Sequence, residues 1–141
     1  MHCGLLFAFL CCICTRLQAQ QNIYIRSLLD DKNFRCLSID GQNCMWAGAS
    51  DGLYMINNSV ETAYRTVIVG NQETNLFDVS SLVCINNAVI FTTLDHLMLL
   101  DKKEQTFTPI LIDNYNYTPS AMAAYGNQVY MYFPAISSLI L

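Results

Sequence analysis

The sequence predicts an all-β fold, and three observations support this class. From about residue 35 onward, short apolar segments alternate with polar positions at period two, and no sustained period near 3.6 appears. Polar turn clusters such as DGQN, SDG, NN and KKEQ separate these segments. The layout then repeats at offsets of 44 and 40 residues. A repeat of this length is typical of β-propeller blades, which are four-stranded antiparallel meanders.

The first predicted blade spans residues 35–77, after an entry strand and loop at residues 20–34. Its four expected strands have the sequences RCLSID, CMWAGA, LYMIN and AYRTVIV. Its turns are expected at DGQN, SDG and NSVET, and GNQETN ends the blade. Short strands joined by short polar turns predict an antiparallel meander.

The second predicted blade spans residues 78–119 and has the expected strands SSLVCI, AVIFTT, LMLLD and TFTPILI. Placing the first blade over it at offset 44 puts Trp46 over Ile90 and Gly48 over Thr92. The third blade, at residues 120–141, is partial, and its MAAYGNQVYMY lies over LVCINNAVIFT. We expect about two and a half blades of an incomplete propeller. A sandwich or small barrel also has evenly spaced strands, so spacing alone leaves that alternative open.

The amino terminus carries an uninterrupted apolar run, CGLLFAFLCCIC, at residues 3–14. About 12 residues are too few to cross a bilayer but suit the core of a secretory signal. We therefore predict a signal peptide at residues 1–19, cleaved after Ala19, and a periplasmic mature chain. No Lys or Arg precedes the run. A hydrophobic first strand or helix of a cytosolic domain is the alternative.

Cysteine content and charge restrict the function further. Removing the leader leaves Cys36, Cys44 and Cys84, without a CxxC pair or a histidine at metal-ligand spacing, so neither a metal nor another cofactor is expected. If one pair were oxidised, Cys36 with Cys44 on adjacent strands would be the choice. The whole chain has a net charge of −4, and its charges are scattered. No contact with nucleic acid is expected.

One stretch, DGQNCMWAGASDGLY, combines turn residues with a large anchor. Asp-Gly pairs supply the positive-φ positions of tight turns. Trp46 and Gly48 are expected on the same face of one strand, with Trp46 filling the space between neighbouring sheets and Gly48 leaving clearance for a close neighbour. The structural blade motif comprises Asp40, Gly41, Trp46, Gly48, Asp51, Gly52 and Leu53.

These residues resemble the repeat of the two-component regulator propeller family, although Ala49 stands where threonine is usual and the second copy lacks the tryptophan and the glycine. The resemblance implies the amino-terminal periplasmic sensor part of a hybrid two-component system of Bacteroidetes. It implies further blades in a longer chain, a membrane helix, a histidine kinase and a response regulator downstream, and a homodimer of the full-length protein. It also implies an oligosaccharide ligand released from a complex glycan, sensed to control polysaccharide-utilisation genes.

The remaining polar residues do not predict an enzyme. The carboxylates fall almost entirely in predicted turns, and His96 also lies in one, so no catalytic residue is assigned. Tyr115 and Tyr117, in the loop 113–119, are the candidate ligand contacts because aromatic rings stack on sugars; packing between blades is the alternative for them. A secreted propeller enzyme, such as a lyase or glycoside hydrolase, and a secreted interaction module are the rival functions.

Overall fold

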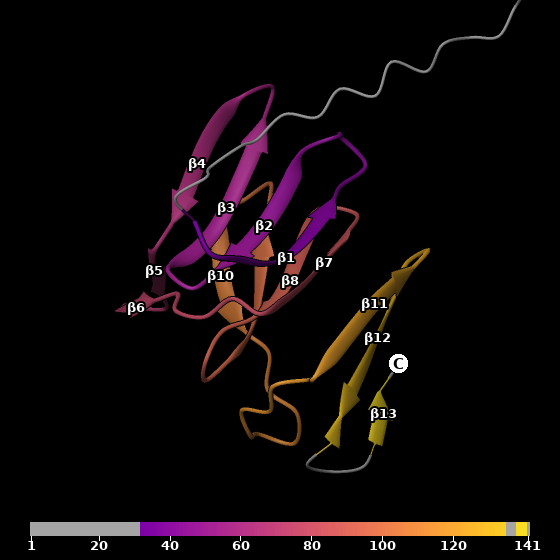
Figure 1. The fold of residues 1–141 in the computed structure, drawn as a ribbon. Helices are drawn as coiled ribbons and strands as arrows, with labels where there is room; N and C mark the ends of the chain where they lie inside the picture. Colours follow the sequence, from indigo (N-terminus) through magenta and orange to yellow (C-terminus); the bar gives the residue numbers. More distant parts are fainter. Residues whose placement is uncertain (1–31, 135–137, 141) are drawn as a thin grey trace, which may run out of the picture. The chain divides into compact units, whose positions relative to one another are not determined.

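The computed structural model describes residues 32–134 and 138–140, and the regular elements among them are all β-strands (Figure 1). This confirms the predicted all-β fold class. The predicted signal peptide and most of the entry segment lie outside the described residues. Within the described part of the chain, no helix has the length and apolar character needed to span a membrane. The strands are β1 (Phe34–Ile39), β2 (Met45–Ala49), β3 (Gly52–Asn57), β4 (Val60–Tyr64), β5 (Thr66–Val69), β6 (Gln72–Asn75), β7 (Ser81–Ile85), β8 (Ala88–Thr92), β9 (Leu97–Asp101), β10 (Thr106–Pro109), β11 (Ala121–Tyr125), β12 (Gln128–Phe133) and β13 (Ser138–Ile140).

Each sheet is an antiparallel meander in which sequential strands are neighbours (Figure 1). Two sheets have four strands, β1-β2-β3-β4 and β7-β8-β9-β10, as expected for two complete blades. The third sheet, β11-β12-β13, contains the three strands expected of the partial blade. We refer to these as the first, second and third sheets. They show the propeller-type meander, open rather than closed on itself.

The fourth strand of the first sheet differs from its expected position. It was expected at residues 63–69, but β4 begins at Val60, directly after the two-residue turn Asn58-Ser59. Both turn residues have positive φ, 46° and 74°, which is the geometry of a type I′ hairpin turn. The sequence prediction was wrong there because serine is not a typical residue for the second position of such a turn.

A separate hairpin, β5-β6, occupies the region that was expected to end the first blade. Val69 pairs with Gln72 across Gly70, whose φ of 62° permits a two-residue turn. The amide of Leu76 donates to the carbonyl of Arg65 at 2.8 Å and closes the base of this hairpin. The strand Gln72–Asn75 contains no apolar side chain, so alternation gave no signal for it.

Two apolar cores lie on opposite faces of the second sheet. The first core combines residues of the first and second sheets with residues of the β5-β6 hairpin and the segment that follows it. Its buried members are Cys44, Trp46, Leu53, Val67, Leu76, Val79, Leu82, Val89, Phe91, Met98 and Leu100. The second core combines the other face of the second sheet with the third sheet. Its buried members are Val83, Ile90, Leu97 and Phe133, and Met122, Val129 and Met131 pack against them. Because side chains alternate along a strand, one sheet can contribute to both cores.

The stacking follows the repeat found in the sequence. Gly48 pairs with Leu53 in the first sheet, and Thr92 pairs with Leu97 in the second. Trp46 faces the core shared with the second sheet, whereas Ile90 faces the core shared with the third. Trp46 and Ile90, which are superposed at offset 44, therefore each face the sheet that follows their own. This front-to-back order is how successive propeller blades pack.

Candidate functional site

The motif of the first sheet centres on the carboxylate of Asp40, which is 2% exposed. Its Oδ1 accepts hydrogen bonds from the amides of Gln42 and Cys44 at 2.9 and 3.0 Å. Its Oδ2 accepts from the indole Nε1 of Trp46 at 3.0 Å and from Nζ of Lys102 at 2.9 Å. Asp40 therefore closes its own turn, orients the tryptophan and binds a lysine from the second sheet.

These contacts set the protonation state of Asp40. Burial by itself raises the pKa of a carboxyl group, because the charged form loses its hydration. Hydrogen bonds from Lys102, Trp46 and the amides of Gln42 and Cys44 outweigh that effect and lower the pKa of Asp40 to about 2. A carboxyl group held in the charged form is suited to structure and is a poor general acid at neutral pH.

Trp46 and Gly48 face the same side of β2, as expected. The indole is 1% exposed and stacks on Tyr64, with 6.2 Å between ring centroids. A Cβ on Gly48 would lie 2.5 Å from Cγ1 of Val79 and 2.6 Å from the Val79 carbonyl oxygen. Trp46 therefore packs in the core between the first and second sheets, and a side chain at position 48 would clash with Val79.

The two Asp-Gly pairs differ in their geometry. Gly52 has a φ of 150°, and a Cβ there would lie 2.5 Å from the carbonyl oxygen of Tyr64, so glycine is required. Gly41 has no positive φ and open space around it; the positive φ of that turn belongs to Asn43, at 60°. The prediction that Gly41 supplies a positive φ was wrong because the turn has a different register.

Asp51 anchors a second polar cluster, around the fully buried Tyr54. Its Oδ2 accepts from the Tyr54 hydroxyl at 2.7 Å and lies 3.3 Å from Nε of Arg65. Burial and the bond to Asp51 raise the pKa of Tyr54. Leu53, the last motif residue, is fully buried in the first core. The seven motif residues therefore lie at turns and sheet contacts, not around a cavity.

The candidate ligand contacts, Tyr115 and Tyr117, lie in the segment between β10 and β11. Tyr115 is 64% exposed and pairs with Ile112 in an isolated bridge. The two rings are 6.0 Å apart, and Tyr117 also lies edge-on to the buried Phe133 at 6.4 Å. Tyr117 therefore packs against the second core, whereas the Tyr115 ring is accessible to solvent.

The three described cysteines are free thiols. Cys36 pairs with Gly48, whereas Cys44 precedes Met45, which pairs with Ile39 at the other end of the β1-β2 ladder. The expectation that Cys36 and Cys44 lie together was wrong, because antiparallel pairing places them toward opposite ends. Burial raises the pKa of Cys36 and Cys84. Among residues 32–134 and 138–140, no group of three or more metal-ligating side chains occurs.

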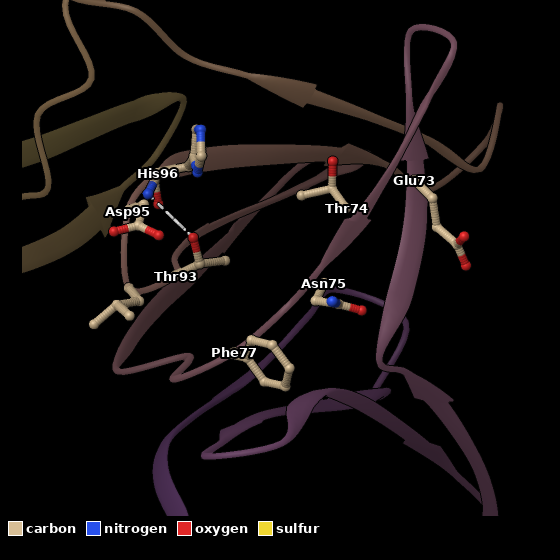
Figure 2. Close-up of a pocket in the computed structure, with 8 residues that line it drawn as sticks. Glu73, Thr74, Asn75, Phe77, Thr93, Asp95 and His96 are labelled. Atoms are coloured by element: carbon tan, nitrogen blue, oxygen red, sulfur yellow. Dashed lines mark hydrogen bonds between the residues drawn. The ribbon is translucent and has the colours of Figure 1, made fainter.

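The surface contains a hollow of about 310 Å³ that the sequence did not predict, and we call it the Phe77 pocket. Figure 2 shows the ring of Phe77 between two groups of side chains, one from β6 and one from the β8–β9 loop. The pocket is lined by Glu73, Thr74, Asn75, Phe77, Thr93, Leu94, Asp95 and His96. Residues 73–77 and 93–96 form it, and the unpredicted strand β6 provides one side. The backbone hydrogen bond from the amide of Leu94 to the carbonyl of Phe77 joins the two segments. Alternation revealed neither β6 nor this contact.

No protein-family model matches the chain, and no curated protein matches it. Among solved structures, it is similar to the extracellular domain of a protein from B. thetaiotaomicron described as a one-component system. The aligned residues are 15% identical, and the TM-score is 0.35. The alignment covers 84% of this chain but only 22% of the matched chain. The family indicated by the Asp-Gly and Trp-Ala-Gly motif stays a prediction.

Proposed function

We propose that this chain is the amino-terminal propeller segment of a periplasmic sensor, acting by binding and not by catalysis. The observation that carries the proposal is the front-to-back stacking of three meanders, because such sheets form arrays that continue by the same contact. On the third sheet, the positions equivalent to Ile90 and Thr92 are Tyr130 and Tyr132. Tyr132 is 47% exposed, and Tyr125 on the same face is 80% exposed. A further blade of a longer chain is the occupant we propose for this face.

Genomic sequencing beyond the codon for Leu141 tests the sensor proposal. We expect an open reading frame with further blades of about 44 residues, a membrane helix and a histidine kinase. A stop codon followed by a transcription terminator would contradict it. A reading frame that continues into a lyase or glycoside hydrolase domain would favour the enzyme alternative instead.

The proposed ligand is an oligosaccharide, by resemblance to glycan-sensing propellers, and its proposed contact is the exposed ring of Tyr115 with Tyr117 beside it. Binding to immobilised plant and host glycan fragments, measured by microarray and then by calorimetry, tests this. We expect Tyr115→Ala to abolish most of the binding, and Tyr125→Ala, which removes an even more exposed ring elsewhere, to leave it unchanged. Equal losses in both variants would contradict the assignment.

A further inference from the structure

The Phe77 pocket has an apolar floor that is exposed although its backbone is fixed. Leu76 and Val79, on either side, are fully buried. The amides of Asp78 and Val79 donate to the carbonyls of Ser50 and Ala49, each at 3.0 Å. The Phe77 side chain nevertheless remains 55% exposed. An anchored backbone thus presents an aromatic ring to solvent, so little ordering is needed before a ligand binds.

The opposite side of the pocket is equally fixed. The amide of Leu94 donates to the carbonyl of Phe77 at 3.0 Å and joins the two sides. Thr93, only 7% exposed, closes the loop because its Oγ1 accepts from the amide of His96 at 3.1 Å and its amide donates to the His96 carbonyl at 2.8 Å. The Leu94 side chain is 65% exposed and adds a second apolar contact.

The charged side chains that line the pocket are both acidic. It contains the carboxylates of Glu73 and Asp95 and no Lys or Arg. Neither carboxylate forms an ion pair with any of the described residues. In Figure 2 they lie on opposite sides of the Phe77 ring. An anionic ligand would be repelled by this lining, whereas a cation would be attracted by both carboxylates and by the negative face of the ring.

We propose that the Phe77 pocket binds a small organic cation, a substituted ammonium group whose alkyl carbons contact Phe77 and Leu94. Its positive charge lies over the aromatic ring and between Glu73 and Asp95. Hydroxyl or amide groups of the same ligand have hydrogen-bonding partners at Thr74, Asn75 and His96. A hollow of about 310 Å³ lies at the small end of the usual range for ligand pockets, which suits a ligand of few heavy atoms.

The decisive experiment compares choline with 3,3-dimethylbutan-1-ol, a neutral molecule of nearly the same shape, by calorimetry on the full chain. We expect choline to bind at least about tenfold more tightly, and increasing sodium chloride to weaken choline alone. Equal affinity for the two molecules, or no binding of choline at millimolar concentration, would overturn the proposal. Because neither probe is a sugar, the result is independent of the proposed oligosaccharide site at Tyr115.

Variants of the pocket identify where choline binds. Phe77→Leu keeps apolar contact but removes the ring, and we expect about fivefold weaker binding. Asp95→Asn and Glu73→Gln should each weaken binding, whereas Glu61→Gln, on β4 and outside the pocket lining, should not. Near-UV circular dichroism of each variant establishes that it folds as the parent does. If folded Phe77→Leu and Asp95→Asn chains bind choline as tightly as the parent, the site is elsewhere and the proposal fails.

Discussion

The first and second sheets share one strand order but are held together by different chemistry. In the first sheet, β1 and β2 are joined by a five-residue connection from Asp40 to Cys44. The Asp40 carboxylate accepts hydrogen bonds from the backbone of this connection, from Trp46 and from Lys102. In the second sheet, the equivalent strands meet at the two-residue turn Asn86-Asn87, and apolar side chains fill both faces. The same strand order thus accommodates a buried carboxylate at this connection in one sheet and a short turn between apolar strands in the other. The difference explains why the motif is recognisable in only one copy.

Removing the Asp40 carboxylate should have the largest effect on stability, because the second sheet has no equivalent buried carboxylate. Asp40→Ala leaves the ammonium group of Lys102, only 10% exposed, without its carboxylate and leaves the indole Nε1 and two amides unpaired. We expect a loss of about 3–5 kcal/mol in the free energy of unfolding, measured by urea titration at neutral pH.

Asp101 on the second sheet provides the matched control. Its Oδ1 also accepts two backbone amides, those of Lys103 and Glu104, at 2.8 and 3.0 Å, but at an exposed turn. Asp101→Ala should therefore destabilise far less. Equal effects of the two substitutions would show that the burial of Asp40 has no energetic importance.

Acid should weaken the first sheet more than the second. The folded pKa of Asp40 is about 2, below the value near 3.9 of an unfolded chain. The stabilisation by ionised Asp40 is therefore fully present above about pH 5, and it is lost as the pH falls through 4 toward 2. We expect a loss of about 2–3 kcal/mol over that range. Urea titrations between pH 6 and pH 2 measure it, and an Asp40→Asn chain with the same pH dependence would refute the assignment.

Adding one methyl group at the sheet contact should have the next largest effect. Gly48→Ala places a Cβ against Val79 at 2.5 Å, and the carbonyl oxygen nearby is part of the backbone and cannot turn away. We expect destabilisation by about 1–3 kcal/mol. The equivalent position of the second sheet is Thr92, which already carries a side chain. Gly41→Ala, in open space, should change stability by less than about 0.5 kcal/mol, and a larger effect there would contradict this explanation.

The smallest expected effect concerns the polar contact of the second sheet. Thr92 Oγ1 accepts from the amide of Ser81 at 3.1 Å and lies 3.1 Å from the hydroxyl of Ser80. Thr92→Val leaves that amide unpaired, so we expect a loss of about 1 kcal/mol by the same titration. Thr108→Val on the exposed side of β10 should be close to neutral. A loss comparable with that of Asp40→Ala would show that the second sheet also depends on a polar centre.

Most strands were predictable because they are short apolar runs bounded by polar turns. β2, β3, β8 and β9 carry apolar side chains in nearly every inward position. The repeat at offset 44 matched Trp46 with Ile90, and both face the sheet that follows their own. β6 was not predictable by alternation, since none of its four residues is apolar. The Phe77 pocket depends on that strand and remained hidden with it.

The burial of Asp40 was unpredictable for a different reason. An aspartate before glycine is typical of an exposed turn, and its partner Lys102 is 62 residues away in the sequence. A local pattern cannot report a contact of that range. The same limit applies to Tyr117, where only the third sheet supplies Phe133 as its neighbour.

The bond between Asp40 and Lys102 also has a consequence for the order in which the chain folds during synthesis. The first sheet emerges from the ribosome well before Lys102. Until Lys102 is in place, the Asp40 carboxylate either is buried without a counter-ion or stays hydrated, with the connection from Asp40 to Cys44 not yet folded around it. Repeat proteins often fold one unit at a time through neighbour contacts. Here the first unit reaches full stability only when the turn after β9 has formed. We therefore expect the first two meanders to unfold as one cooperative unit and not one at a time.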